Sequence, residues 1–228
     1  MKTVLVTGAS HGIGKAIAEK LCQQYRVIAL DKEVPTHPFF EQFYACDLSN
    51  TQELHATIGK IKNEITSLYG LVNNAGIFIH KSLHEQSLQE WEKIIAVNLT
   101  APYILSQAFA SFLKQGHIIN IASTRAFMSE AGTEPYSASK GGMIALTHAL
   151  SISLAGQVSV NSISPGWINT DESYVATVEE KAWHSSGRIG KPSDIAEVVS
   201  FLLEREDGFI TGSDFVVDGG VTKKMVYP

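Results

Sequence analysis

Short runs of β-branched and aliphatic residues alternate with longer segments of helical period along almost the whole chain. Runs typical of strands lie at Thr3–Thr7, Arg26–Asp31, Phe43–Cys46, Leu71–Asn73, His117–Ala122, Val158–Ile163 and Phe215–Val217. Segments of helical period lie between them, at residues 13–24, 51–65, 88–114, 136–154 and 193–204. Apolar strands that alternate with helices are typical of a parallel sheet covered on both faces. The pattern therefore predicts an α/β fold, a doubly wound parallel sheet of about seven strands, in a single domain over residues 1–228.

Composition and charge narrow the class of protein. The chain is 44% hydrophobic and 18% charged, which is typical of a folded, soluble protein and not of a disordered one. Its formal net charge is −5 and it has no block of basic residues, so we expect neither nucleic acid nor an anionic membrane surface as a partner. Cys22 and Cys46 lack the spacing of metal ligands, and we expect two reduced cysteines and no metal site.

Two segments bear on where the protein resides. The first ten residues, MKTVLVTGAS, run directly into a strand-like segment and a glycine-rich turn, so we expect no signal peptide and a cytoplasmic protein. The uncharged segment Ile94–Leu113 is long enough to span a bilayer, but Asn98, Pro102 and Gln107 interrupt it. We therefore expect a buried or interface helix in this segment and no membrane association.

A glycine-rich turn, TGASHGIG (7–14), joins the first predicted strand to the first predicted helix. Its glycines, Gly8, Gly12 and Gly14, would let the backbone approach a pyrophosphate at the positive N-terminus of that helix. A turn of this composition between a strand and a helix predicts a dinucleotide-binding sheet of Rossmann type.

The residues after the second strand bear on which dinucleotide binds. Asp31 closes that strand, where a carboxylate accepts hydrogen bonds from the adenosine ribose hydroxyls and repels a 2′-phosphate. Lys32 and His11 offer positive charge to a phosphate and act in the opposite direction. On balance the sequence favours NAD over NADP.

Tyr136 and Lys140 lie four residues apart in TEPYSASKGGM (133–143), where a helix is predicted to begin. Oxidation of an alcohol by a nicotinamide removes a hydride from carbon and a proton from oxygen, so such a site needs a base. Free tyrosine, with a pKa near 10, becomes a base at neutral pH only with about 4 kcal/mol of preferential stabilisation of the phenolate. The Lys140 ammonium and the helix N-terminus both favour the phenolate. Ser123, at the end of a predicted strand, would hydrogen-bond the substrate oxygen.

These motifs and several others follow one another along almost the whole chain. In sequence order they are TGASHGIG (7–14), Asp31, DL (47–48), NNAG (73–76), VN (97–98), NIAS (120–123), YSASK (136–140), SPGWINT (164–170) and DGG (218–220). Their order and spacing resemble those of the short-chain dehydrogenase/reductase family. The resemblance implies an NAD(P)-dependent oxidoreductase whose catalytic residues are Asn98, Ser123, Tyr136 and Lys140. It also implies that Lys140 grips the nicotinamide ribose and that Asn98 holds a water that relays the proton.

The same resemblance gives the remaining motif positions a place around the cofactor. Residues 47–48 would hold the adenine ring, and residues 74–76 would line the ribose side. Residues 165, 166 and 168 would lie under the nicotinamide, with Thr170 near its carboxamide. The full cofactor-binding set is expected to be Gly8, Ser10, His11, Gly12, Ile13, Gly14, Asp31, Asp47, Leu48, Asn74, Ala75, Gly76, Tyr136, Lys140, Pro165, Gly166, Ile168 and Thr170.

Substrate contacts are expected from two segments that flank this site. The segment STRAFMSEAGTEP (123–135) brings Arg125 and two glutamates close to Tyr136 in sequence, where they would suit a polar substrate. A carboxylate beside Tyr136 would raise its pKa, so we expect the glutamates to face away or to bind a substrate group. Residues 171–192 take the place of the family's mobile lid and are short and poorly apolar, which predicts a shallow or partly open pocket. The expected substrate residues are Glu130, Glu134, Trp167, Trp183 and His184.

The leading hypothesis is an NAD(H)-dependent oxidoreductase that interconverts a secondary alcohol and a ketone on a small-molecule substrate. An NADPH-dependent 3-oxoacyl reductase is an alternative, supported by His11 and Lys32. A third hypothesis, from a different class, is a non-catalytic dinucleotide-binding sensor or scaffold on the same fold. The segments 94–113 and 136–154 carry little charge, and in the family the equivalent helices pack against a second subunit. The resemblance therefore implies a homodimer or a homotetramer.

Overall fold

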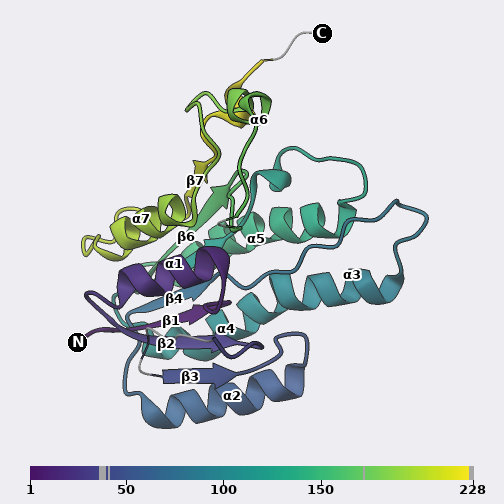
Figure 1. Cartoon of the computed structure of the whole chain (residues 1–228). Coiled ribbons are helices and arrows are strands. Elements are labelled where there is room, and N and C mark those ends of the chain that lie inside the picture. The colour runs from purple at the N-terminus through teal and green to yellow at the C-terminus, as the bar shows by residue number, and fades with distance from the viewer. Residues whose placement is uncertain (36–39, 41, 172, 226–228) are drawn as a thin grey trace.

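The computed structural model describes residues 1–35, 40, 42–171 and 173–225. Within them, seven parallel strands form one sheet in the order β3-β2-β1-β4-β5-β6-β7 (Figure 1). The strands are β1 Thr3–Thr7, β2 Arg26–Asp31, β3 Gln42–Ala45, β4 Gly70–Asn73, β5 Gly116–Ile121, β6 Val158–Pro165 and β7 Asp214–Val217. The chain first adds strands on one side of β1 and then, from β4 onward, on the other side. The carboxyl ends of β1 and β4 therefore flank the point where the strand order reverses, which is where such sheets bind ligands.

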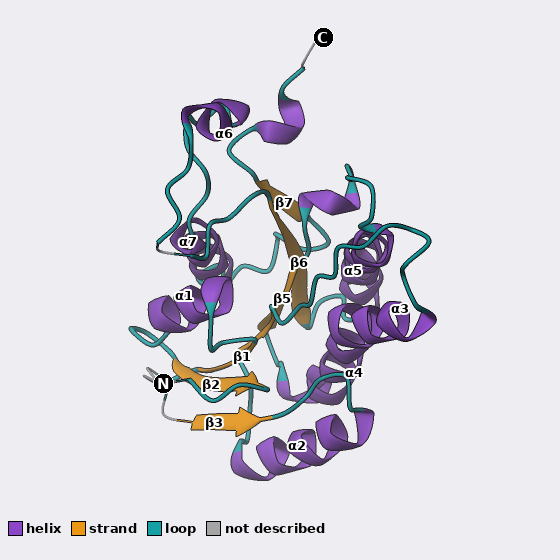
Figure 2. Ribbon diagram, turned by 45° about the vertical axis from the view of Figure 1, so that its right-hand side comes forward, coloured by secondary structure: helices purple, strands orange, loops and turns teal. Residues whose placement is uncertain are grey.

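Helices cover both faces of this sheet, as Figure 2 shows. On one face lie α1 Gly12–Leu21 and α7 Pro192–Leu203, and on the other α2 Thr51–Glu64, α4 Ala101–Phe109 and α5 Glu134–Ser153. Because side chains alternate along a strand, Val4 and Val6 of β1 enter the apolar core under α1 and α7, and Leu5 enters the core under α2 and α4. All three are fully buried, and each contributes about 1.5–3 kcal/mol by leaving water. The predicted doubly wound α/β fold of Rossmann type is confirmed.

The predicted element bounds agree with the structure to within a few residues. The segment of helical period at 88–114 is helical from Leu88 to Phe112, but its hydrogen bonding changes along the way: α3 Leu88–Ile95 is followed by a π-helical turn at Ala96–Thr100, by α4, and by a 3₁₀ turn at Ala110–Phe112. Pro102 lacks an N–H and cannot donate to the carbonyl of Asn98 four residues before it. The turn instead closes with bonds of longer span, such as Ala101 N–H to the carbonyl of Ala96.

The Leu88–Phe112 run passes the length and hydropathy test for a membrane-crossing helix, with a mean hydropathy of 1.3. In the structure 44% of its most apolar window is buried inside the protein. Leu105 and Phe109 are fully buried in the core under α2 and α4. This part of the run therefore serves as a core helix of the fold.

A short helix that the periodicity does not predict, α6 Val178–Trp183, lies in the segment expected to be the lid. Its N-terminus has a capping box, in which the Thr177 side chain accepts from Glu180 N–H and the Glu180 carboxylate accepts from Thr177 N–H. Figures 1 and 2 show α6 beyond the carboxyl end of β7, apart from α3 and α5. Val175 and Val178 are 83% and 84% exposed, so the apolar side chains of this segment are uncovered.

Candidate active site

The TGASHGIG turn connects β1 to α1, and its glycines leave the main chain without side chains around it. Gly8 (φ +66°) and Gly12 (φ +51°) are left-handed, which glycine adopts without strain. A Cβ on Gly14 would lie 1.9 Å from the main-chain oxygen of Gly8, and a Cβ on Gly12 would lie 3.0 Å from the side chain of Thr170. The Asn74 amide donates to the main-chain oxygen of Gly8 (3.1 Å) and so fastens this turn to the NNAG turn after β4. The glycines thus keep a cradle of main-chain atoms open at the start of α1.

A cavity of about 360 Å³ opens beside this cradle, lined mainly by residues that follow β1, β2, β3 and β4. The predicted cofactor residues that line it are Gly8, His11, Ile13, Gly14, Asp31, Asp47, Leu48, Asn74, Ala75, Gly76 and Thr170. The lining also contains Lys32, Glu33, Cys46, Ile77, Lys93 and Val97, which are outside the expected cofactor-binding set. The predicted residues Ser10, Gly12, Tyr136, Lys140, Pro165, Gly166 and Ile168 are not part of this lining.

The acidic end of the cavity is tied to the glycine turn. One carboxylate oxygen of Asp31 accepts from Ser10 N–H (2.9 Å), and the other accepts from Glu33 N–H (3.3 Å). The Glu33 carboxylate lies 3.5 Å from His11 Nε2 and 3.5 Å from Lys32 Nζ. His11 and Lys32, the two basic side chains expected to favour a 2′-phosphate, therefore both face Glu33, which lies outside the family motifs.

Asp47 is held in a turn of its own. Its Oδ1 accepts from the hydroxyl (2.7 Å) and the N–H (2.9 Å) of Ser49, and these hydrogen bonds lower the pKa of the carboxyl. Its main-chain N–H donates to Glu53 of α2 (3.1 Å). The Asp47 carboxylate thus stays ionised, and it lines the cavity where the resemblance places the adenine ring.

Asn98 lies in the π-helical turn and is fully buried. Its Oδ1 accepts from Ile77 N–H (2.8 Å), and its amide donates to the Ile77 carbonyl (3.0 Å) and to Ser139 Oγ (3.1 Å). The side chain therefore locks the segment after the NNAG turn onto α5. These three bonds occupy the side-chain amide, whereas the main-chain oxygen of Asn98 loses its usual helical donor at Pro102.

Tyr136 and Lys140 lie in the first two turns of α5, beside the end of β5. Lys140 is 3% exposed, and its Nζ donates to the carbonyl of Ile121 (2.8 Å) and lies 5.5 Å from the centroid of the Tyr136 ring. Burial lowers the pKa of Lys140 to about 8. A Cβ on Gly76 would lie 3.5 Å from Lys140 Nζ and 3.5 Å from Asn98 Oδ1. The NNAG turn, the π-helical turn and α5 therefore meet at this glycine.

The expected lowering of the Tyr136 pKa is wrong for the protein without bound ligands. Burial raises the pKa of Tyr136, while hydrogen bonding with Ser123 and the charge of Arg125 act to lower it. The lysine is itself buried, bound to the Ile121 carbonyl, and less basic than usual, which limits its effect on the phenol. Ser123 is buried at the carboxyl end of β5, and its Oγ accepts from Arg125 N–H (3.2 Å).

The SPGWINT segment continues from β6 across the end of the sheet. Gly166 N–H donates to the carbonyl of Val217 (3.0 Å), and a Cβ on Gly166 would lie 2.7 Å from the Cβ of Asp218. Ile168 pairs in a parallel bridge with Gly190. Because Thr170 lies against Gly12, this segment runs back to the glycine turn.

Three of the expected substrate residues form an aromatic cluster at the base of the lid. The ring centroid of Trp167 lies 5.9 Å from that of Trp183 and 6.4 Å from that of His184. His184 is 4% exposed, its Nδ1 lies 3.1 Å from the Glu180 carbonyl, and its side chain lies within 3.3 Å of a Cβ built on Gly219. His184 thus packs inside the lid, whereas Trp167 and Trp183 remain partly exposed.

The two expected substrate glutamates, which both precede Tyr136 in the sequence, lie in different environments. The Glu130 carboxylate pairs with Arg125 Nη2 (2.9 Å), and the Glu134 carboxylate accepts from Gln86 Nε2 (2.6 Å). Hydrogen bonding from its own main-chain N–H and from Gln86 lowers the pKa of the exposed Glu134 carboxyl. Both carboxylates are thus paired with groups other than Tyr136.

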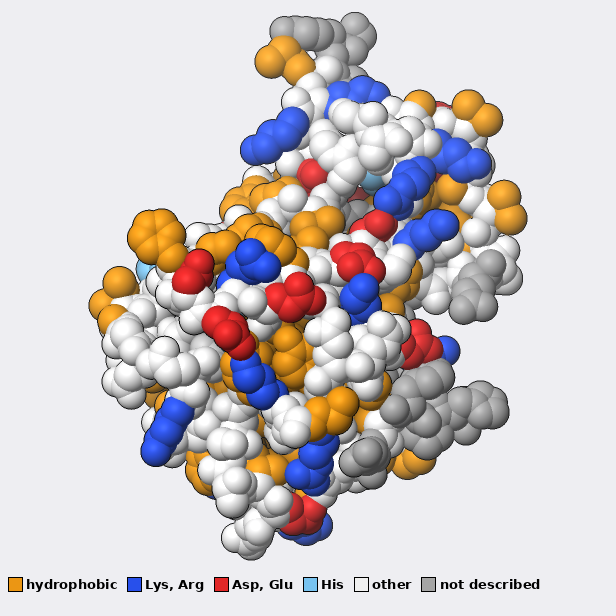
Figure 3. Space-filling view, turned by 90° about the vertical axis from the view of Figure 1, so that its left-hand side faces the viewer, with side chains coloured by type: hydrophobic (Ala, Val, Ile, Leu, Met, Phe, Trp, Pro, Cys, Tyr) orange, Lys and Arg blue, Asp and Glu red, His pale blue; other side chains and the backbone are white. Residues whose placement is uncertain are grey.

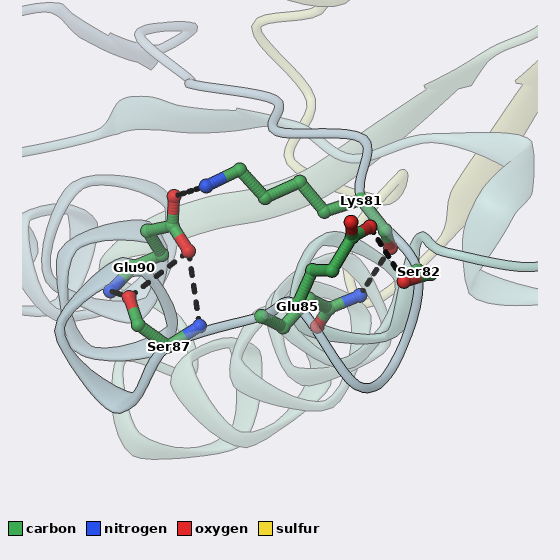
Figure 4. A network of polar contacts seen from close by, with 6 residues as sticks. Lys81, Ser82, Glu85, Ser87 and Glu90 are labelled. Atoms are coloured by element: carbon green, nitrogen blue, oxygen red, sulfur yellow. Dashed lines mark hydrogen bonds and ion pairs between the residues drawn. The ribbon is translucent and has the colours of Figure 1, made fainter.

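The loop that carries Gln86 is held by a network of its own, shown in Figure 4. Lys81 pairs with Glu90 at the start of α3, Ser82 donates to Glu85 (2.6 Å), and the side chains of Ser87 and Glu90 form a capping box. Gln86 also donates to the main-chain oxygen of Lys81 (3.0 Å). The network fixes the loop in the position from which it binds Glu134.

On the face of the molecule shown in Figure 3, acidic and basic side chains are interspersed among apolar ones. Ion pairs between distant parts of the chain include Lys2 with Glu206 (2.6 Å) and Lys20 with Glu197 (2.8 Å). Such exposed pairs contribute at most about 1 kcal/mol each to stability.

A doubly wound sheet with a glycine cradle at the switch point and a Ser–Tyr–Lys set beyond the end of β5 defines a dinucleotide-binding oxidoreductase. The family model described as enoyl-(acyl carrier protein) reductase matches residues 8–222. An oxidoreductase of Thermotoga maritima is 43% identical, with 99% of this chain and 98% of the relative covered. The 3-oxoacyl-[acyl-carrier-protein] reductase FabG of Vibrio cholerae is 35% identical, with 96% and 97% covered. The chain belongs to the short-chain dehydrogenase/reductase family of NAD(P)-dependent oxidoreductases.

Solved structures agree with this assignment. A 4-hydroxyisoleucine dehydrogenase complexed with NADH has a TM-score of 0.91 at 32% identity, over 99% of this chain and 100% of that one. The same dehydrogenase complexed with NADH and succinate has a TM-score of 0.88 at 33% identity, over 97% and 100%. A blue fluorescent protein from a metagenomic library, in complex with NADPH, has a TM-score of 0.87 at 28% identity, over 96% and 97%.

Proposed function

We propose that the protein is an NAD(H)-dependent oxidoreductase that interconverts a secondary alcohol and a ketone, with Tyr136 as the general acid/base. The observation that carries the proposal is that Ser123, Tyr136 and Lys140 lie close together. Ser123 follows the carboxyl end of β5, and the other two lie in the first two turns of α5, next to the glycine cradle. A non-catalytic sensor has no need of a buried lysine beside a tyrosine, because burial of that cation costs free energy.

The cradle fits the dinucleotide. Gly8, Gly12 and Gly14 leave main-chain atoms uncovered where added Cβ atoms would clash with neighbours, and the side chain of His11, the N-cap residue, does not cap α1. The first N–H groups of α1 are therefore available to a pyrophosphate. When bound, NAD supplies the hydride acceptor for the alcohol carbon.

The chain's own residues handle the oxygen and its proton. Ser123 Oγ hydrogen-bonds the substrate oxygen and holds it against the Tyr136 hydroxyl. Tyr136 removes the proton during oxidation and returns it during reduction. Lys140 stabilises the phenolate and passes the proton onward, toward a water held by the Asn98 carbonyl. Because burial raises the pKa of Tyr136, the phenolate needs this stabilisation, and the positive charge of Arg125 adds to it.

The choice of NAD rests on the acidic end of the cavity. Asp31 and Glu33 both present carboxylates there, and Glu33 pairs with His11 and Lys32, the two residues that favour a 2′-phosphate. The NADPH-dependent 3-oxoacyl reductase remains the second candidate, because relatives with that reductase activity in their names are 34–35% identical to this chain. Comparison of kcat/KM for NADH and NADPH separates the two.

We also propose a homodimer or homotetramer. Trp91 of α3, Tyr103 of α4 and Ile152 of α5 are 40%, 46% and 78% exposed, and packing of these helices against a second subunit would remove this apolar surface from water. Light scattering at micromolar concentration tests this, and a monomer would overturn it.

The function itself is tested by a screen for NADH formation across secondary alcohols that include polyols, sugars, hydroxy acids and steroids, with NAD and with NADP. The proposal predicts reduction of NAD with at least one class and a lower kcat/KM with NADP. Failure of every alcohol and of the matching ketones with NADH, although NADH binds, would favour the non-catalytic alternative.

A further inference from the structure

Arg125 occupies the position two residues after Ser123, in a 3₁₀ turn at Thr124–Ala126 that follows β5. Its guanidinium carbon lies 5.3 Å from the centroid of the Phe78 ring, and that ring packs edge-to-face on Tyr136 with centroids 5.0 Å apart. The guanidinium and the tyrosine ring are therefore at most about 10 Å apart, and both contact the same phenyl ring. The charge of Arg125 also reaches the phenol, since it acts to lower the Tyr136 pKa.

The hydrogen bonding of this guanidinium is incomplete. Nη2 donates to Glu130 (2.9 Å), whose side chain is 71% exposed, whereas Nη1 is buried and has no hydrogen-bond partner among the described residues. A buried donor without a partner costs free energy, and folded proteins rarely leave one without a reason. The exposed pair with Glu130 offsets little of that cost.

The contact with Phe78 also does not explain why Nη1 is buried without a hydrogen-bond partner. A guanidinium over a phenyl ring is held by a weak cation–π attraction, and this contact leaves the N–H groups, which lie in the guanidinium plane, free for other partners. The side chain is 25% exposed, so a small solute can reach its neighbourhood. An Nη1–H and Nη2–H pair is the fork that binds a carboxylate in bidentate fashion.

We infer that Arg125 binds a carboxylate, or a compact anion of like shape, on the substrate itself. The substrate is then a secondary alcohol or ketone that carries an anionic group a few carbons from the reacting carbon, with Phe78 against the carbons between. Glu130 holds one arm of the fork in the free protein and competes with the substrate anion for it. The inference rests on the proposed function, because it places Arg125 beside the reacting oxygen held by Ser123 and Tyr136.

The neighbouring glutamate is compatible with an anionic substrate. Glu134 is hydrogen-bonded to Gln86 of the loop that the Lys81–Glu90 network holds in place (Figure 4), and to Gly132 N–H (3.4 Å). This arrangement directs its charge to the loop after the NNAG turn. Lys140, although buried, adds a second positive group near Tyr136.

The test uses an unreactive dicarboxylate, succinate, so that binding is measured apart from chemistry. Calorimetric titration of the protein–NADH complex with succinate compares the wild type with Arg125→Gln, Glu130→Gln and Arg205→Gln. Arg205 is the matched control, because its guanidinium lies 4.9 Å from the Phe201 ring in the same kind of stacking, at the end of α7. Dimethyl succinate, which has the same carbon chain and no charge, is the ligand control.

We expect Arg125→Gln to weaken succinate binding about 10- to 100-fold, as loss of a charge-assisted hydrogen bond does. Glu130→Gln should strengthen it about two- to fivefold by freeing the fork. Arg205→Gln should leave it unchanged, and dimethyl succinate should bind none of the proteins measurably. With turnover as a second readout, Arg125→Gln should lower kcat/KM for 4-hydroxypentanoate far more than for its methyl ester, a ratio in which any effect on Tyr136 cancels.

Equal succinate affinity in the wild type and Arg125→Gln, or equal losses in Arg125→Gln and Arg205→Gln, would overturn the inference. So would absence of succinate binding to the wild-type NADH complex. If NADH itself does not bind, the proposed function fails instead, and titration of the free protein with succinate still decides whether Arg125 is an anion site.

Discussion

The ammonium of Lys140 donates a 2.8 Å hydrogen bond to the main-chain oxygen of Ile121, the last residue of β5. This contact holds a cation inside the protein, and burial lowers the pKa of Lys140 to about 8, against about 10.5 for an exposed lysine. The lysine is thus close to losing its proton at a pH where most enzymes work, which suits a group that takes part in proton transfer.

The lowered pKa makes stability depend on pH in a defined direction. Between about pH 8 and pH 10.5 the unfolded chain binds a proton at Lys140 that the folded protein has released, so the free energy of unfolding rises with pH in this window. Lys140→Met removes this dependence. Urea unfolding of both proteins at pH 7, 8, 9 and 10 should show the wild type gaining about 2–3 kcal/mol relative to the variant. If the free energies of unfolding of the two proteins change with pH in parallel, burial does not lower the pKa of Lys140.

Two glycines give opposite results when alanine replaces them. At Gly14 the new Cβ would lie 1.9 Å from the Gly8 oxygen, so Gly14→Ala should displace the glycine turn and weaken NADH binding at least tenfold. Gly59 lies inside α2, and a Cβ there meets nothing within 4 Å. Gly59→Ala should raise stability by about 0.5–1 kcal/mol and leave NADH binding unchanged. Thermal unfolding and fluorescence titration check both, and equal NADH affinity in the two variants would contradict the cradle.

The acidic end of the cavity predicts a change in cofactor preference. Glu33→Gln releases His11 and Lys32 from their shared partner and removes a negative charge. We expect NADPH to bind about 3- to 10-fold more tightly, with NADH affinity within about twofold of wild type. Glu19→Gln, which removes a carboxylate paired with Lys15 on α1, is the charge-matched control. An equal gain in NADPH affinity in Glu19→Gln would mean that the net charge of the protein, and not the contacts of Glu33, sets the preference.

Much of the fold follows from the sequence because its strands are short apolar runs that only a covered parallel sheet can bury. The bounds of β1 and β2 were predicted to the residue. The π-helical turn at Ala96–Thr100 was not, because it depends on Pro102 withholding one hydrogen bond inside a segment of regular helical period. The lid helix α6 has six residues, too few for a periodic pattern.

The site divides in the same way. Residues at strand ends were predicted because parallel strands bring their carboxyl ends to one edge of the sheet, and the cavity beside Gly8 and Asp31 lies there. The pairing of side chains was not predicted, because it joins residues far apart in the sequence, such as Glu33 and His11. The pKa of Tyr136 depends on how deeply the ring is buried, and the spacing of Tyr136 and Lys140 carries no information about that depth.

The central claim is that Tyr136 is the acid/base of an NAD(H)-dependent reaction. It is tested most directly by kinetics and NADH titration of Tyr136→Phe, with the alcohol that the screen identifies and with Tyr103→Phe, on the exposed side of α4, as the control. We predict a fall in kcat of about 100- to 10,000-fold for Tyr136→Phe, with NADH affinity and the control's kcat close to wild type. A Tyr136→Phe protein that keeps its kcat while it binds NADH normally would contradict the account.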